Sequence, residues 1–490
     1  DGNRWRAILR AMHRHKSARL RRVAQRRAST VRLHTPNVIR PHRSAAKGQE
    51  QQLALRRRHH HVEAELALED VHSLTRRILD LELEILRHNT FFRIETNDQS
   101  KFRSIRQFLY NLSASSVSLG SSTTIMSHRW STDKPHNDVL EAGAIGLVVG
   151  QAIIQAGIVT EKLVDLARER RAWKKGYSPK QVTVRVSELK DQLDELLARR
   201  VSTLSSLKNV SPGTLKILTD ETRVLVQLRN LVLMEFARFY ADQSKRRTSR
   251  NVSYINGLVA TAAGGYGGSL IGLLGVTRQK PSYTVPAGIG FIASSAAVLV
   301  SPYVNRFFAN RAKDRGMAEA KAALGELSMG SMETLDTDLN ALSMAVKTAR
   351  PGERPFHIQE RLSVYSSEFE ILRQQLLRES SGISEGKRLF RRRVLANGVI
   401  AGSKMAWGVM LITAGAGLSN NGVAFNKRVA EAATVYTVGQ GAWVADSLSS
   451  GTTPKSLKFT VGGQISFELE KLEKRYERLK ELEELVVDSK

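Results

Sequence analysis

Asn251–Thr277 reads NVSYINGLVATAAGGYGGSLIGLLGVT and Pro281–Asn305 reads PSYTVPAGIGFIASSAAVLVSPYVN, and neither segment contains a charged residue. About 20 apolar residues are enough to cross the hydrocarbon core of a bilayer as a helix, and both segments exceed that length. Pro281 interrupts a helix, and the basic residues Arg278 and Lys280 flank it. The sequence therefore predicts a helical hairpin over 251–305, with its turn near Gln279–Ser282 and its faces buried in lipid or against other helices.

Three further segments share this composition: Ala142–Thr160, Val394–Leu418, in which Lys404 is the only charged residue, and Ala432–Ala445. The first is borderline in length for a membrane span, and the last is too short to span alone. Within these apolar runs, glycines recur at four-residue intervals and so form ridges that let another helix approach closely. The glycines predicted to pack helices together are Gly146, Gly150, Gly264, Gly268 and Gly272.

The rest of the chain is charged, with apolar residues alternately three and four positions apart, the spacing of coiled coils. Examples are Leu74, Ile78, Leu81 and Ile85; Leu335, Leu339, Leu342 and Val346; Ile358, Leu362, Tyr365, Phe369, Leu372 and Leu376; and Ile465, Leu469, Leu472 and Tyr476. Turn sequences at Asn209–Gly213 and Pro351–Pro355 divide these stretches. We therefore expect two antiparallel helical hairpins, over 182–244 and 314–380, with Glu221 and Leu362 at seam positions.

The two kinds of segment alternate with a period. A basic patch leads into Asn111, Asn256 or Asn397, and a small-residue run follows each; the asparagines are 145 and 141 residues apart. This spacing indicates about three degraded copies of one unit, although chance similarity between low-complexity helices is the alternative. The expected architecture is all-α: coiled-coil hairpins alternate with Gly/Ala-rich apolar hairpins. The expected segments are 1–61, 62–135, 136–245, 246–386 and 387–490.

Positive charge is concentrated at the N-terminus. The chain has 75 Lys and Arg against 47 Asp and Glu, and residues 1–61 alone carry a net charge of +15. Such a segment is typical of a basic arm without a fold of its own, which binds phosphates or anionic lipid, covers an acidic subunit, or belongs to a targeting region. The chain begins at Asp1, which fits a processed terminus or a trimmed chain. The cations assigned to anionic-surface binding are Arg4, Arg6, Arg10, Arg14, Arg21, Arg22, Arg26 and Arg27.

Membrane insertion and burial in a tight soluble interface both explain the uncharged runs, and basic residues at their ends favour the membrane. In that case both coiled-coil hairpins lie on one side, and the positive-inside rule assigns that side to the cytoplasm or a matrix of an envelope or organelle membrane. Polar residues in such runs are functional candidates. They are Glu141, Gln151, Gln155 and Lys404. The simpler interpretations are a helix cap for Glu141, interhelical bonds for the glutamines, and a snorkelling ammonium for Lys404.

Catalytic patterns are missing from the sequence. The chain has no cysteine, which excludes thiolate chemistry and disulfides. Gly382–Arg388 resembles a phosphate loop, but one residue is missing between the glycines, and Arg388 stands where Ser or Thr should ligate magnesium. We therefore expect a non-enzyme without metal or cofactor.

Three functions fit such a chain. The first is a structural subunit of a membrane-associated homo- or hetero-oligomer. The second is a pore or translocation conduit lined by small-residue helices, and the third is a soluble helical protein that binds nucleic acid through the basic arm.

Overall fold

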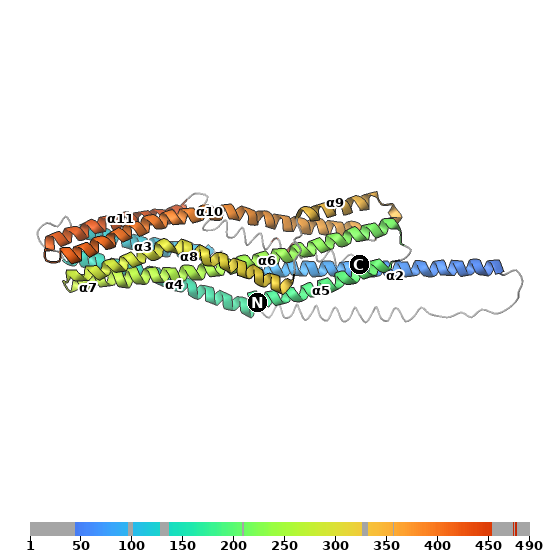
Figure 1. Ribbon diagram of the computed structural model, residues 1–490, viewed down its shortest axis with the longest axis horizontal. Coiled ribbons are helices and arrows are strands. Elements are labelled where there is room, and N and C mark those ends of the chain that lie inside the picture. Colours follow the sequence, from blue (N-terminus) through green and yellow to red (C-terminus); the bar gives the residue numbers. More distant parts are fainter. Residues whose placement is uncertain are drawn as a thin grey trace. The chain divides into compact units, whose positions relative to one another are not determined.

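The computed structural model describes residues 45–96, 101–127, 137–207, 210–325, 332–355 and 357–452, together with residues 474, 476 and 477. Every element in these ranges is helical, so the all-α prediction is confirmed for them (Figure 1). The chain divides into two units, Asp1–Glu63 and Ala64–Lys490, and the packing discussed below lies within the second. The elements are α2 (Ala45–Thr96), α3 (Lys101–Ser127), α4 (Asn137–Lys174), α5 (Pro179–Ser206), α6 (Pro212–Ala262), η2 (Ala263–Leu270), α7 (Ile271–Thr277), η3 (Pro281–Tyr283), α8 (Thr284–Leu324), α9 (Met332–Thr348), η4 (Pro351–Glu353), α10 (Ile358–Gly417) and α11 (Gly422–Thr452).

Local chemistry explains where the helices begin. The hydroxyl of Ser178 accepts a hydrogen bond from the Gln181 amide, and the Gln181 side chain accepts one from the Ser178 amide, which forms a capping box at the start of α5. Ser211 caps α6 through the Thr214 amide, and Pro212 follows at the first helical position. Because the cap and the proline together start a new helix, the expected break at Asn209–Gly213 separates α5 from α6.

The predicted hairpin over 251–305 is present. Its first helical arm consists of the end of α6, followed by η2 and α7, and its second arm is α8. Gln279 adopts a left-handed conformation with φ of 55° between them, and Pro281 begins η3. One feature was not expected: η2 is a π-helical segment over Ala263–Leu270. Within it, the side-chain hydroxyl of Ser269 donates a hydrogen bond to the Gly264 carbonyl.

The expected helix over 314–348 is interrupted. α8 ends at Leu324, because Gly325 takes a φ of 74° that a helix cannot continue through, and α9 begins at Met332. The heptad residues of α9 are buried as expected. In α10, however, Leu362 and Phe369 only pack against the edge of the core, and the buried face runs instead through Tyr365 and the neighbouring Glu368.

Two helix bundles share α6, α8 and α10. The first, which we call the arm bundle, contains α5, α9, the described part of α2 from Ala64, the beginnings of α6 and α10, and the end of α8. Its core is rich in Leu, Ile and Val. The second, which we call the small-residue bundle, contains α3, α4, α7, α11, the end of α6 with η2, the uncharged part of α8 and the end of α10. The segment boundaries expected at 245/246 and 386/387 fall inside α6 and α10, which run through both bundles without a break.

Candidate functional site

Lys404 is the charged residue of the small-residue bundle whose position is most unusual. It lies on α10 with only 7% of its surface exposed. Its ammonium donates a hydrogen bond of 2.6 Å to the hydroxyl of Ser294 on α8, and it lies 5.8 Å from the centre of the Phe291 ring. Ser294 in turn donates to the Ala260 carbonyl on α6, at 2.7 Å. In this structure Lys404 therefore joins three helices, instead of extending toward headgroups as the simpler interpretation expected.

The glycine at position 264 makes this arrangement sterically feasible. A Cβ there would lie 2.7 Å from the Lys404 Nζ and 2.9 Å from the Ser294 Oγ, so any larger residue would displace the ammonium. Gly264 also belongs to the π-helical segment η2, and such segments occur frequently at functional sites. Lys404, Ser294 and Gly264 thus form one polar cluster inside the small-residue bundle.

The structure places the other predicted packing glycines at helix contacts as well. Gly146 and Gly150 on α4 face Ser121 and Ser118 on α3. A Cβ at Gly268 would lie 2.9 Å from the Phe291 ring, whereas one at Gly272 would meet Ala287 at an ordinary 3.8 Å. At positions 146, 150 and 268 the neighbouring side chains therefore fit as placed only against glycine, whereas position 272 has room for a Cβ.

Sequence reasoning missed two close contacts between the backbones of neighbouring helices. A Cβ at Gly290 on α8 would collide with the backbone of Gly267 in η2. Gly288 on α8 and Gly408 on α10 pack against each other in a similar way. A Cβ on Gly408 would lie 2.6 Å from the Gly288 carbonyl oxygen. The signal was the short Gly288–Gly290 repeat, which does not follow the four-residue spacing used to find the others.

The remaining predicted polar residues take less central positions. Gln151 is buried on α4 and faces Gly265 of η2, and Gln155 accepts a hydrogen bond of 3.3 Å from the Tyr266 hydroxyl. Both contacts join α4 to η2, as the interhelical interpretation expects. Glu141 is half-buried near the beginning of α4. The eight arginines from Arg4 to Arg27, and the C-terminal heptads from Ile465 to Tyr476 except for Tyr476 itself, lie outside the described residues.

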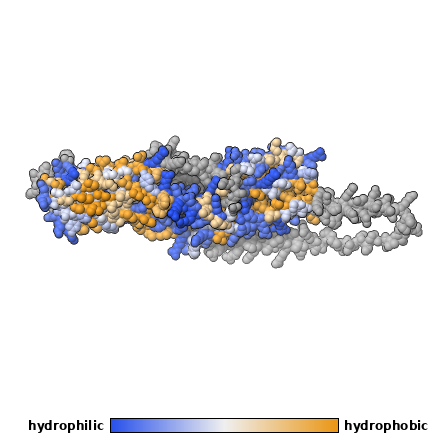
Figure 2. Space-filling view, viewed as in Figure 1, coloured by the Kyte–Doolittle hydropathy of each residue, from blue (hydrophilic) through white to orange (hydrophobic). Residues whose placement is uncertain are grey.

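The outer surface of the small-residue bundle is apolar. Large hydrophobic side chains project from it at Ile145, Val149, Ile255, Val259, Ile289, Val300, Val399 and Val409. Figure 2 shows a broad hydrophobic area over the helices of this bundle, with more hydrophilic surface beside it. Among the residues that the structure describes, four helical stretches are long and apolar enough to cross a membrane. They lie within Asp138–Ser206, Pro212–Thr277, Pro281–Leu324 and Phe390–Gly417.

The arm bundle buries charges of another kind. Arg200 on α5 is fully buried and donates to a Glu221 carboxylate oxygen on α6 at 2.7 Å. Glu221 also accepts from Arg361 at 2.7 Å and from the Tyr365 hydroxyl at 2.8 Å. Glu221 and Tyr365 were both expected at seam positions, but the two arginines were not singled out, because on charge-rich helices they resemble solvated residues.

His72 on α2 belongs to the same network. Its Nδ1 accepts a hydrogen bond of 2.8 Å from Arg361, which fixes the neutral ring with its proton on Nε2. Burial, and then the positive charge of Arg361, lower the pKa of His72 from 6.5 to about 4. The ring therefore stays neutral across the physiological range.

A second acidic pair lies further along the arm bundle. Glu82 on α2 and Glu368 on α10 are fully buried, and neither carboxyl forms a hydrogen bond to any residue the structure describes. Burial, and then the neighbouring Glu368 carboxyl, raise the pKa of Glu82 well above its ordinary value, and burial raises the pKa of Glu368 to about 8. Glu368 is accordingly protonated at neutral pH, and burial favours the protonated form of Glu82 too.

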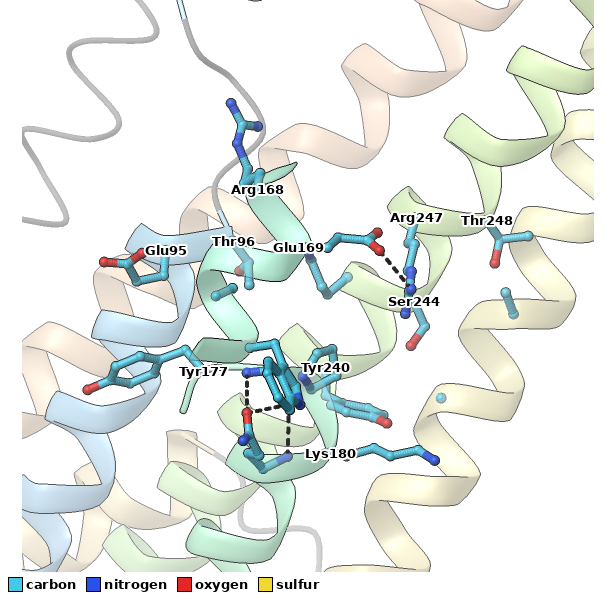
Figure 3. Close-up of a pocket in the computed structure, with 18 of the residues that line it drawn as sticks. Glu95, Thr96, Arg168, Glu169, Tyr177, Lys180, Tyr240, Ser244, Arg247 and Thr248 are labelled. Carbon is cyan, nitrogen blue, oxygen red and sulfur yellow. Dashed lines mark hydrogen bonds and ion pairs between the residues drawn. The ribbon is translucent and has the colours of Figure 1, made fainter. Parts of the chain in front are cut away.

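A polar cavity of about 700 Å³ lies where α4, α5, α6 and α8 approach one another (Figure 3). Its lining includes aromatic residues (Trp173, Tyr177, Tyr240) and side chains of both charges. Within the described part of the chain, no cluster of three or more His, Cys, Asp or Glu could hold a metal ion. No family model, no curated protein and no solved structure matches this chain.

Proposed function

We propose that this protein is a structural subunit of a membrane-associated assembly. The observation that carries the proposal is the distribution of residues in the small-residue bundle. Glycines, serines and the Lys404 cluster lie at the helix contacts beside buried aromatic residues such as Trp407, while large hydrophobic side chains such as Ile289 and Val409 are also exposed on the outer surface. In water a bundle places its large apolar residues inside, but in lipid close packing of small residues holds helices together and the apolar residues face the acyl chains.

The arrangement of charges supports an orientation in the membrane. The short connections at Arg278–Lys280 and Ser419–Asn421 lie at the same end of the bundle, since Gly415 of α10 packs against the Pro281 carbonyl. The basic residues that flank the uncharged runs, Lys245–Arg250 and Arg306–Arg311, belong to the opposite end. By the positive-inside rule the arm bundle then faces the cytoplasm or a matrix, in a bacterial envelope or an organelle inner membrane.

The arm bundle and the basic arm would serve as contacts for other subunits. Buried charged groups such as the Glu221 network fix which helices pair more than they add stability, which suits a scaffold. The basic arm of residues 1–61 would bind an anionic surface, whether lipid, nucleic acid or an acidic subunit. A chain without residues 1–47 should keep its helical core and lose most of the salt dependence of partner binding, because that dependence comes from released counterions. An unchanged salt slope would contradict this role for the arm.

A pore lined by the same helices is less well supported. Lys404 and Gln151 are buried by neighbouring helices of the same chain, so neither is presented to a lumen by a single subunit. Conductance of reconstituted vesicles separates the two functions, because a scaffold leaves vesicles closed.

Membrane extraction tests the proposal. The full chain should pellet with membranes and stay there after washing with high salt and with alkaline carbonate, which remove peripheral proteins. Release of the intact chain by either wash would contradict insertion of the small-residue bundle.

A further inference from the structure

The 700 Å³ cavity lies next to the points where the uncharged helical runs end. Arg250 and Arg247 of α6 line it, and the uncharged run begins at Asn251. Asp165 of α4 and Arg315 of α8 line it too, five and ten residues beyond the ends of their uncharged runs at Thr160 and Asn305. At 1.5 Å per residue the cavity begins within about 10 Å of the apolar surface, which is the depth of phospholipid headgroups.

The acidic side chains of the cavity are already engaged. Asp165 accepts from the Tyr254 hydroxyl at 2.6 Å, and Glu169 accepts from Arg247 at 3.0 Å, an ion pair drawn in Figure 3. Glu95 accepts from Lys175 at 2.5 Å, and Glu319 accepts from Tyr240 at 3.2 Å. Each of the four carboxylates therefore has a partner within the protein.

Two cationic side chains that line the cavity have no such partner among the described residues. Among the residues that the structure describes, Lys180 and Arg315 take part in no hydrogen bond or ion pair. Lys180 lies in the first turn of α5 and extends its side chain toward α8 (Figure 3). That turn, Pro179–Gln181, also lines the cavity, and the positive end of a helix dipole adds to the attraction of an anion. The cavity thus has acceptors that are satisfied and cationic donors that are free.

We infer that this cavity binds the phosphate group of an anionic phospholipid, with Lys180 and Arg315 as its principal ligands. Trp173 lines the same cavity with 60% of its surface exposed, and tryptophan at the level of headgroups is a common membrane anchor. A bound lipid would place its phosphate between α5 and α8 and its acyl chains along the outward hydrophobic residues of the small-residue bundle. This inference rests on the proposed insertion in a membrane. A free phosphate offers the same charged group without the acyl chains.

Calorimetric titration of the full chain in detergent separates these ligands. The probes are dihexanoyl phosphatidylglycerol, dihexanoyl phosphatidylcholine and inorganic phosphate. We expect saturable binding of phosphatidylglycerol, with Kd at least about tenfold lower than for either of the other probes. Absence of saturable phosphatidylglycerol binding overturns the inference, and so does equal affinity for phosphatidylcholine. Equal affinity for inorganic phosphate overturns the assignment to lipid.

Matched variants locate the site. The double variant Lys180→Gln and Arg315→Gln should weaken phosphatidylglycerol binding about tenfold or more, because two charge-assisted contacts are lost. The control, Lys174→Gln with Arg311→Gln, removes the same charge from exposed cations that do not line the cavity, and should change Kd less than about threefold. All four side chains are exposed, so both variants should fold, and each single substitution at Lys180 and Arg315 should give part of the loss.

Equal Kd values for the two double variants overturn the site. Carbonate extraction of the same proteins keeps this result separate from the proposed function. If the wild-type chain resists extraction and the two double variants bind lipid equally, the cavity inference fails and the proposed function stands. A wild-type chain that carbonate releases contradicts the proposed function, whatever the titration gives.

Discussion

The arm bundle and the small-residue bundle are parts of the same long helices, yet they differ in the residues found where helices meet. Along α10, Ile358, Tyr365 and Leu372 are buried in the arm bundle. Further along the same helix, Gly408 is buried and Val409 is 48% exposed. The arm bundle therefore joins its helices through large side chains, and the small-residue bundle joins them in part through glycine.

The two bundles also differ in how their buried charged groups are partnered. The arm bundle holds full ion networks, as around Glu221, where a second charge compensates the first. The small-residue bundle holds Lys404 with a hydroxyl partner, and in the described part of the chain no carboxylate forms an ion pair with it. The arm bundle is thus sensitive to loss of charge, and the small-residue bundle to gain of volume or charge.

The largest effect is expected from Glu221→Leu in the arm bundle. The substitution leaves the guanidiniums of Arg200 and Arg361 buried without a counter-charge, which costs about 3–5 kcal/mol. Thermal unfolding of the full chain in detergent measures it. Glu188→Leu serves as a control, because Glu188 forms only an exposed pair with Arg185, which contributes at most about 1 kcal/mol. Equal melting temperatures for the two variants would show that the network does not hold the arm bundle together.

The small-residue bundle should instead be sensitive to added volume. Gly290→Leu places side-chain atoms where the backbone of Gly267 lies, and overpacking of this kind costs about 3 kcal/mol or prevents assembly. Gly402→Leu is the matched change on an exposed face of α10, where nothing lies within 4 Å, and it should be neutral or slightly stabilising. Melting in detergent distinguishes them, and a tolerated Gly290→Leu would argue against close contact of η2 with α8.

A matched pair of valines compares the two surfaces. Val409 on α10 is 48% exposed, and Val201 on α5 is 52% exposed. Val409→Lys should impair membrane insertion by about 2.5–3.5 kcal/mol, because the ammonium would enter hydrocarbon. Val201→Lys should change stability by less than about 0.5 kcal/mol, because it faces water. The fraction of each variant in carbonate-washed membranes is the readout, and similar fractions would mean that the two surfaces meet the same solvent.

The smallest effects are expected from pH, and they concern the arm bundle alone. His72 stays neutral when folded, so stability falls as pH drops from 6.5 toward 4, where only the unfolded chain takes up the proton. Glu368 stays protonated when folded, so stability also falls as pH rises from its ordinary value of 4.5 toward 8. Melting temperature should therefore peak near pH 5–6.

Two substitutions assign the limbs of that profile. His72→Gln keeps an acceptor for Arg361 without titrating and should flatten the acid limb. Glu368→Gln should flatten the alkaline limb and raise the melting temperature at pH 8. A profile that neither substitution alters would place the pH dependence elsewhere in the chain.

Periodicity predicted the all-helical fold and several of the buried helix faces. The seam of α9, from Leu335 to Val346, and the break at Pro212 follow from spacing and from the chemistry of helix caps. Neither depends on which helix lies opposite, so the sequence alone was sufficient for both.

Features that depend on the opposite helix were not predictable in this way. The pairing of Gly290 with Gly267, the π-helical segment η2 and the burial of Arg200 all require knowledge of the neighbour. Leu362 was wrongly predicted at the seam for the same reason. The spacing predicts an apolar stripe along α10, but contacts from α2 and α6 shift the centre of the buried face of this helix toward Glu368. Lys404 was predicted as a candidate because a single charge in an uncharged run can be recognised from the sequence alone. Its hydrogen bond to Ser294 could not be predicted in this way.

The central claim, that the hydrophobic surface of the small-residue bundle faces lipid, can be tested with single cysteines, because the chain has none of its own. Val409→Cys and Val201→Cys are each treated in native membranes with a membrane-impermeant maleimide, and again after unfolding in detergent. The account predicts that Val201→Cys reacts in both conditions in opened membranes, whereas Val409→Cys reacts only after unfolding, although both side chains are about half exposed on the folded chain. Equal labelling of the two thiols in intact folded protein would contradict a lipid-facing surface.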